Sequence, residues 1–149
     1  MTKILLSLHV LAAIVAVGPV TVAASMFPPA ARRAAPTTVG TVALLHRICR
    51  VYAGVGLTVP VLGFATAAAM GVLGSGWLVT SIALTAAGAG VLAAFVLPRQ
   101  EEILEQLEGE QAPDRRATVQ LAMLTGIFNL LWATVTVLMV VRPGSTTGA

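Results

Sequence analysis

The sequence predicts an all-α integral membrane protein, a four-helix bundle with antiparallel up-down topology. The first observation is composition: of 149 residues, 57% are apolar and 10% charged, whereas soluble domains average about 45–50% and about 25%. The mean hydropathy is +0.91. The second is that four uncharged stretches are each long enough to cross a bilayer, which takes about 20 residues of helix. Helices are expected because the backbone must satisfy its own hydrogen bonds in lipid.

These stretches form one membrane domain over residues 1–149. The predicted spans cover residues 4–27, 45–71, 77–97 and 117–141. We expect loops over residues 28–44 and 98–116, and a disordered tail over residues 143–149. The first span also has features of a secretory signal, but its apolar run is long for one and contains Gly18 and Pro19. We therefore expect it to be retained as a span.

The distribution of basic residues predicts the orientation. Both long loops and the start of the second span are rich in arginine, whereas the opposite side carries only Lys3 and Arg142. Basic residues gather on the cytoplasmic side of membrane proteins. Both loops are therefore predicted to be cytoplasmic and both termini outside, in the inner (plasma) membrane of a bacterium. The arginines concerned are Arg32, Arg33, Arg47, Arg50, Arg99, Arg115 and Arg116.

All six acidic residues lie in the loop over residues 98–116, which with three arginines has a net charge of −3. The first connection and the start of the second span together carry four arginines and no acid, so we expect the two loop regions to attract. Ile103 and Leu107 have helical spacing and predict a short surface helix that Gly109 ends. Asp114 is placed to cap the fourth span.

His9 is the first candidate site residue, because an ionisable side chain inside a span is a functional candidate by default. Residues three and four positions away on its face are mostly small, such as Ala12, Ala13 and Ala16, so His9 is predicted to face the bundle. One interpretation is that His9 is a ligand of haem b or copper. The favoured alternative is a hydrogen bond to a neighbouring helix or to interfacial water.

His46 and Cys49 are weaker metal candidates. They share a helix face, but a structural metal site usually has four ligands. In an up-down bundle His46 lies about 20 Å from His9 along the axis, so one metal or haem cannot be held by both within one protomer. Haem with two histidine ligands would need His9 from two protomers, joined by the small residues of the first span. Cys49 is the single cysteine, which excludes an internal disulfide.

Asn129 lies near the middle of the fourth span and is predicted to hold helices together by a hydrogen bond. No catalytic residue is predicted, because the sequence contains no phosphate-binding loop, nucleophile elbow or paired-histidine zinc motif. No carboxylate lies within a span, so a small transporter would have no buried charge to couple to an ion.

Four segments of the chain resemble a known family: LHVLAAIVAVGPVTVAASMFPPAARR, LLHRICRVYAGVGLTVPVLGFATA, VLPRQ and LMVVRPG. They resemble the bacterial predicted integral membrane proteins grouped as domain of unknown function 2269. The resemblance covers nearly the whole chain and implies four spans with an early histidine, but no known activity. More distantly, the first span is similar to copper-resistance D and to the membrane protoporphyrinogen oxidases, in which an early histidine binds metal or haem. Only His9 matches, and the chain has no membrane lysine to match the oxidases' second important residue.

The sequence therefore predicts a membrane protein of unknown biochemical role, most simply a non-enzymatic accessory or interaction protein. A haem b or copper protein ligated through His9 is the alternative, and a small transporter is a third class. The expected partners are the lipid bilayer and either a second copy or another membrane protein. Nucleic acid is not expected, because the basic residues are scattered at the ends of the spans. We expect the protein to bind no cofactor in preference to haem b or copper.

Overall fold

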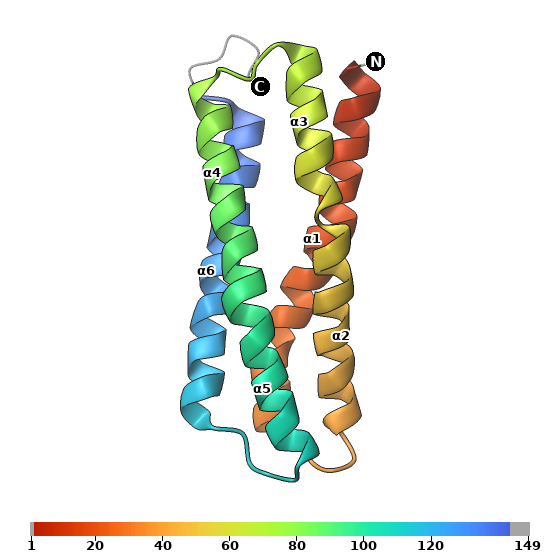
Figure 1. The fold of residues 1–149 in the computed structure, drawn as a ribbon, viewed down its shortest axis with the longest axis vertical. Helices are drawn as coiled ribbons and strands as arrows, with labels where there is room; N and C mark the ends of the chain where they lie inside the picture. Colours follow the sequence, from red (N-terminus) through yellow and green to blue (C-terminus); the bar gives the residue numbers. More distant parts are fainter. Residues whose placement is uncertain (1, 144–149) are drawn as a thin grey trace.

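The computed structural model describes residues 2–143, and these form a long, narrow bundle of helices (Figure 1). The chain passes along the bundle four times, and successive passages run in opposite directions (Figure 1). The elements are α1 (Thr2–Arg32), α2 (Val39–Val55), α3 (Thr58–Met70), α4 (Gly76–Val91), the π-helix η1 (Leu92–Val96), α5 (Leu97–Glu108) and α6 (Arg115–Val141).

The all-α class is confirmed, as is the expectation of four apolar helices of membrane-spanning length. Four helical stretches are long and apolar enough to cross a membrane, and none of residues 2–143 is in a strand. These stretches are Thr2–Arg32, Val39–Met70, Gly76–Glu108 and Arg115–Val141. All but one residue of the tail expected over 143–149 lies outside the described residues.

The first passage is longer than the expected span, because α1 continues through Pro28 and Pro29 to Arg32. A proline inside a helix removes a hydrogen bond and usually ends or kinks the helix. Here Phe27 and Ala31, on either side of the proline pair, are fully buried in the main apolar cluster. Their packing stabilises the last turn, so the first connection is short and α2 already begins at Val39.

The second passage is interrupted by a turn at Gly56 and Leu57, which separates α2 from α3. Pro60 explains the break, since it has no N–H to donate to the Gly56 carbonyl one turn earlier. The Val59 N–H donates to that carbonyl instead, at 3.1 Å. The interruption therefore follows from a local sequence feature.

The third passage is continuous from α4 through η1 into α5, so the short surface helix predicted around Ile103 and Leu107 is the end of this passage and not a separate element. The Leu97 N–H donates five residues back, to the Leu92 carbonyl. The backbone hydrogen bonds thus span five residues instead of four directly before Pro98. Pro98 itself has no N–H to donate. Helix α5 ends at Glu108 and is followed by Gly109, as predicted.

The cap of the fourth passage is also as predicted. The Asp114 carboxylate accepts a hydrogen bond from the Arg116 N–H at 3.0 Å, at the start of α6. A side-chain oxygen at this position satisfies one of the N–H groups that a helix start leaves unpaired.

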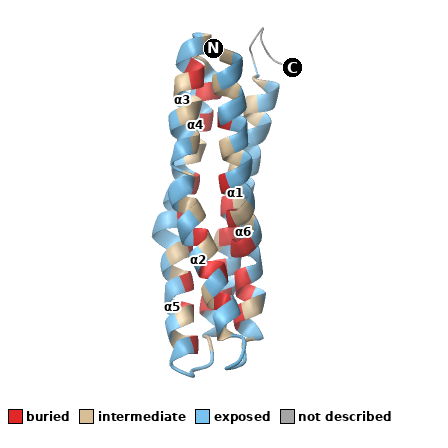
Figure 2. Ribbon diagram, turned by 90° about the vertical axis from the view of Figure 1, so that its right-hand side faces the viewer, coloured by how far each residue is buried: buried red, intermediate tan, exposed pale blue. Residues whose placement is uncertain are grey.

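The main apolar core lies towards the end of the bundle that carries the α1–α2 and α5–α6 connections. Phe27, Val42, Ile103 and Leu121 are fully or almost fully buried there. Outward-facing side chains are apolar as well: Leu130 is 70% exposed. Figure 2 shows the buried residues on the inner sides of the helices and the exposed ones outside. An apolar exterior on a packed bundle is the pattern that a lipid environment favours.

Among residues 2–143, no ion pair joins the two connections that were expected to attract each other. Within residues 2–143 the structure has one ion pair, Arg99 with Glu102 at 3.5 Å, and it lies within α5. The first connection instead meets the core through Ala34 and Val39, which pack against the cluster that contains Ile103 and Leu107. Apolar contact, rather than ion pairing, therefore holds this end together.

Candidate functional site

His9 joins α1 to α3. Its Nδ1 lies 3.0 Å from the backbone carbonyl oxygen of Val59, and the side chain is only 8% exposed. The ring lies over Gly63: a Cβ at that position would be 2.8 Å from the His9 Cε1 atom, closer than atoms can pack. Gly63 therefore provides the space that lets the imidazole reach the backbone of α3.

This contact fixes the proton position on His9. A carbonyl oxygen can only accept, so Nδ1 carries the proton and donates to Val59. In the neutral ring Nε2 then keeps its lone pair. Nδ1 bonded to a backbone carbonyl and Nε2 unprotonated is the tautomer that metal-binding histidines use. The same bond is also sufficient as a fastening between two helices.

His46 and Cys49 meet a residue that the sequence analysis did not single out, Gln100. The Gln100 Oε1 atom lies 2.9 Å from His46 Nδ1, and its Nε2 donates to Cys49 Sγ at 3.5 Å. The Phe27 ring meets the His46 ring edge-on, with the ring centres 6.5 Å apart. All four side chains are buried, and Gln100, His46 and Cys49 form a polar link between α2 and α5 inside the apolar core.

The π-helix places Gln100 in this link. The buried residues Gly88, Leu92, Val96 and Gln100 follow one another at intervals of four. In a regular α-helix each such step overshoots a full turn by about 40°, so three steps would rotate the face by about 120°. A π-helical turn contains more residues and reduces this drift. η1 thus keeps Gln100 facing α2.

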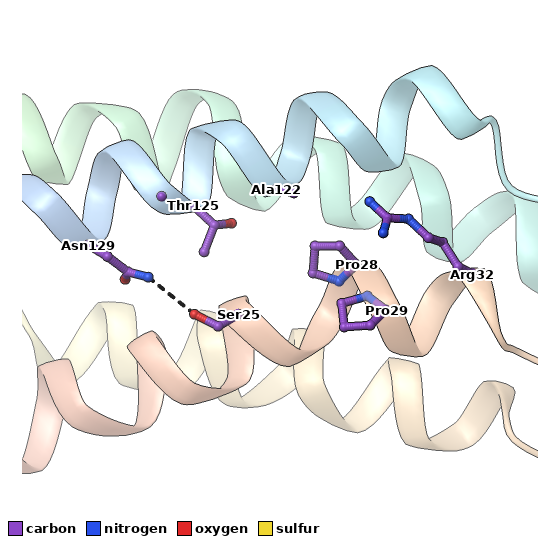
Figure 3. A pocket seen from close by; sticks show the side chains of 8 residues that line it. Ser25, Pro28, Pro29, Arg32, Ala122, Thr125 and Asn129 are labelled. Atoms are coloured by element: carbon purple, nitrogen blue, oxygen red, sulfur yellow. Dashed lines mark hydrogen bonds between the residues drawn. The ribbon is translucent and has the colours of Figure 1, made fainter.

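A third set of polar residues lies between α1 and α6. Asn129 Nδ2 donates to Ser25 Oγ at 3.2 Å, and Arg32 Nε donates to Thr118 Oγ1 at 3.4 Å. Between these two contacts lies a pocket of about 230 Å³ (Figure 3). It is lined by Ser25, Pro28, Pro29, Arg32, Ala122, Thr125, Gly126 and Asn129.

The two histidines do not meet. His9 contacts Val59, which lies thirteen residues after His46 in the second passage, so the rings are separated by about 20 Å along the bundle. Within residues 2–143 no three His, Cys, Asp or Glu side chains are grouped so as to hold a metal ion. Metal or haem binding through His9, and metal binding through His46 and Cys49, remain predictions.

The small-residue face of α1 is occupied by its own protomer. Ala16, Ala23 and Ala24 are buried, and the last two pack in the main core with Leu45 and Cys49 of α2. This part of the small-residue face is therefore covered within one protomer, whereas Ala12 and Ala13 beside His9 are half-buried. A haem shared between two protomers remains a prediction.

Sequence reasoning missed Gln100, Thr125 and Ser25. Gln100 precedes Ile103 by three residues and Leu107 by seven, so the inward spacing of this face was a signal that it is buried. Thr125 lies one turn before Asn129 on the same face. Ser25 gives no such signal, because it becomes a polar partner only through its position opposite α6.

Comparison with known families gives one match. A family model described as predicted integral membrane protein (DUF2269) matches residues 3–143. The chain belongs to this family. No curated protein matches the chain, and neither does any solved structure. Membership in DUF2269 agrees with the apolar, four-span bundle and specifies no activity.

Proposed function

We propose that this DUF2269 protein is a non-enzymatic accessory protein of the bacterial inner membrane, with both termini outside, and that α5 holds a partner at the cytoplasmic surface. The observation that carries this proposal is the position of α5. It extends the third passage beyond the apolar part of the bundle without a break, and it presents an acidic face.

The inner face of α5 is anchored. Gln100 and Ile103 are fully buried, and Leu107 is nearly so. Gln100 also bonds to His46 and Cys49 of α2. Because α5 is tied to both α4 and α2, its outer face has a fixed orientation. A fixed surface loses little conformational freedom when it binds a partner.

The outer face of α5 is acidic. Glu101, Glu105 and Glu108 are exposed, and only Glu102 forms an ion pair, with Arg99, among residues 2–143. Complementary charge steers association and selects partners. The expected partner is therefore a protein with a basic surface, most simply the cytoplasmic face of another membrane protein.

Interior polar groups support the non-enzymatic part of the proposal. His9, His46 and Cys49 each take part in a hydrogen bond to a different helix. Each of these side chains thus links the helix that carries it to another helix of the bundle.

Site-specific photo-crosslinking in native membranes tests the accessory role. A photoreactive residue replacing Glu105 should give a discrete protein adduct, whereas one replacing the lipid-facing Leu130 should not. The adduct should disappear when Glu101 and Glu108 are both changed to Lys. A lack of any adduct at position 105, or an adduct that survives the charge reversal, would contradict the proposal.

Haem b or copper bound through His9 is the second candidate. One observation favours it: the Val59 carbonyl holds Nδ1–H, which leaves the Nε2 lone pair for a ligand. Protein purified from membranes should then contain copper, or show a Soret band, that His9→Ala removes. Colourless and metal-free wild-type protein would reject this candidate.

A further inference from the structure

The pocket between α1 and α6 has the features of a ligand site that neither histidine accounts for. We propose that it binds one anionic phospholipid, with the lipid phosphate at Arg32 and the glycerol-ester region at Thr125 and Asn129. This proposal is independent of the partner suggested for α5.

The shape of the pocket follows from its residues. Ser25, Ala122 and Gly126 have small side chains or none beyond the backbone, so α1 and α6 leave space between them. A Cβ at Gly126 would meet no atom within 4 Å. The volume of about 230 Å³ would hold several water molecules, each of which occupies about 30 Å³ in the liquid. A polar ligand group of moderate size therefore fits.

Thr125 supplies the observation that points to a ligand. Thr125 is 3% exposed, and its hydroxyl has no hydrogen-bond partner in the described chain. Several other hydroxyls in the spans donate to the carbonyl one turn earlier, including those of Thr66, Thr85 and Thr134, although the Thr21 hydroxyl in α1 is also buried without a partner among residues 2–143. In Figure 3 the Thr125 side chain extends from α6 into the space between the helices. Leaving a buried hydroxyl unpaired costs about 1–3 kcal/mol, a cost that a bound acceptor removes.

Asn129 adds a second unpaired atom beside Thr125. Its amide nitrogen donates to Ser25, while its Oδ1 is buried without a partner among residues 2–143. Pro29 also lacks the N–H that would donate to the Ser25 carbonyl in a regular helix. This end of the pocket is thus polar at a depth where the outer surface is apolar. Waters that accompany a lipid headgroup can donate to these acceptors.

Arg32 lies at the other end of the pocket. Its side chain turns back along α1 towards Ala122 (Figure 3). Nε donates to Thr118, and the two terminal NH₂ groups form no bond to any residue within 2–143. A guanidinium with free terminal donors is well suited to bind phosphate.

The order of these groups matches the order of groups in a phospholipid. Ser25 and Arg32 are seven residues apart, about 10 Å along α1. The phosphate would lie at the arginine-rich end, and an ester carbonyl could accept from Thr125 deeper in the membrane. The acyl chains would continue over Val22 and Leu130, the exposed apolar residues one turn beyond Ser25 and Gly126. This direction, polar end outwards and apolar end inwards, favours a bilayer lipid over a soluble phosphate.

Native mass spectrometry of the protein in mild detergent tests the proposal. Phosphatidylglycerol should bind at least about tenfold more tightly than phosphatidylcholine with the same acyl chains. Arg32→Gln should weaken phosphatidylglycerol binding about tenfold, the change expected for losing a hydrogen bond to a charged group. Arg33→Gln is the matched control, since Arg33 is the adjacent arginine and does not line the pocket. It should change the affinity less than twofold.

Two further variants test the pocket itself. Gly126→Leu places a side chain in open space and should abolish the preference for phosphatidylglycerol while the protein stays folded. Thr125→Val keeps the volume and removes the hydroxyl, so it should weaken binding severalfold, whereas Thr134→Val should not. Equal loss in Arg32→Gln and Arg33→Gln, or unchanged binding in Gly126→Leu, would overturn the proposal. Displacement of the lipid by soluble glycerol phosphate would overturn its lipid part.

Discussion

The two ends of the bundle are held together in different ways. At the end with the α1–α2 and α5–α6 connections, all four passages contribute to one large apolar core, and a buried glutamine links α2 to α5. At the end near the termini, α1 packs on α3 and α4 packs on α6, and the second apolar cluster is small: Ala67, Trp77 and Leu78. The two buried histidine contacts therefore lie in different surroundings. The bond between His9 and Val59 lies in the weakly packed half of the bundle, and the bonds of Gln100 lie in the strongly packed half.

We expect the two ends of the bundle to lie on opposite sides of the membrane. In a Cys49→Ser background, a cysteine replacing Gly74 should react with a membrane-impermeant reagent from outside intact cells. A cysteine replacing Gln111 should react only after permeabilisation. This result follows from the arginine distribution, and labelling of the two positions in the reverse order would invert the proposed orientation.

Gln100→Ala should be strongly destabilising at the connection end. It removes both bonds of the amide and leaves His46 and Cys49 unpaired in the core. With about 1–3 kcal/mol for a buried unpaired group, we expect a loss of about 3 kcal/mol in the free energy of unfolding in detergent. Gln111→Ala, at an exposed position, serves as the control. Similar effects of the two changes would show that the Gln100 link contributes little.

Gly63→Ala should weaken the end near the termini. The added Cβ would lie 2.8 Å from His9 Cε1 and would push the imidazole off the Val59 carbonyl. Overpacking and the lost bond together should cost about 1–3 kcal/mol. Gly54→Ala, in the same passage, adds a Cβ that meets no atom within 4 Å, so its stability should stay the same or rise. Thermal unfolding of the two variants in the same detergent compares them directly.

Features that depend on local sequence could be predicted. The four spans follow from apolar runs, and the ends of α5 and α6 from Gly109 and Asp114. Pro28 and Pro29 were expected to lie in a loop, but the burial of their neighbours Phe27 and Ala31 keeps that segment helical. Packing of this kind between distant parts of the chain cannot be predicted from the local sequence.

The candidate sites were less predictable. His9 could be placed inside the bundle from its helical face, but its acceptor is a backbone carbonyl, and every residue has one. Gln100 lies among arginines and glutamates, the sequence context of a surface residue, so only its helical spacing to Ile103 and Leu107 indicates burial. The π-helix η1 then keeps this face directed at α2. The pocket beside Thr125 depends on small residues of two helices that are far apart in the sequence.

The smallest effect is expected where α1 meets α6, between the two ends. Asn129 and Ser25 share one hydrogen bond of 3.2 Å, and bonds of this kind in membrane bundles contribute about 0.6 kcal/mol on average. A double-mutant cycle with Asn129→Ala and Ser25→Ala should therefore give a coupling energy of about that size. The single changes need not be costly, because Asn129 Oδ1 is already unpaired and its removal relieves a buried acceptor. A coupling of 2 kcal/mol or more would mean that this seam, rather than the packing around Phe27, holds α6 to α1. Adding phosphatidylglycerol should raise the coupling if the lipid occupies the pocket, since it would order both side chains.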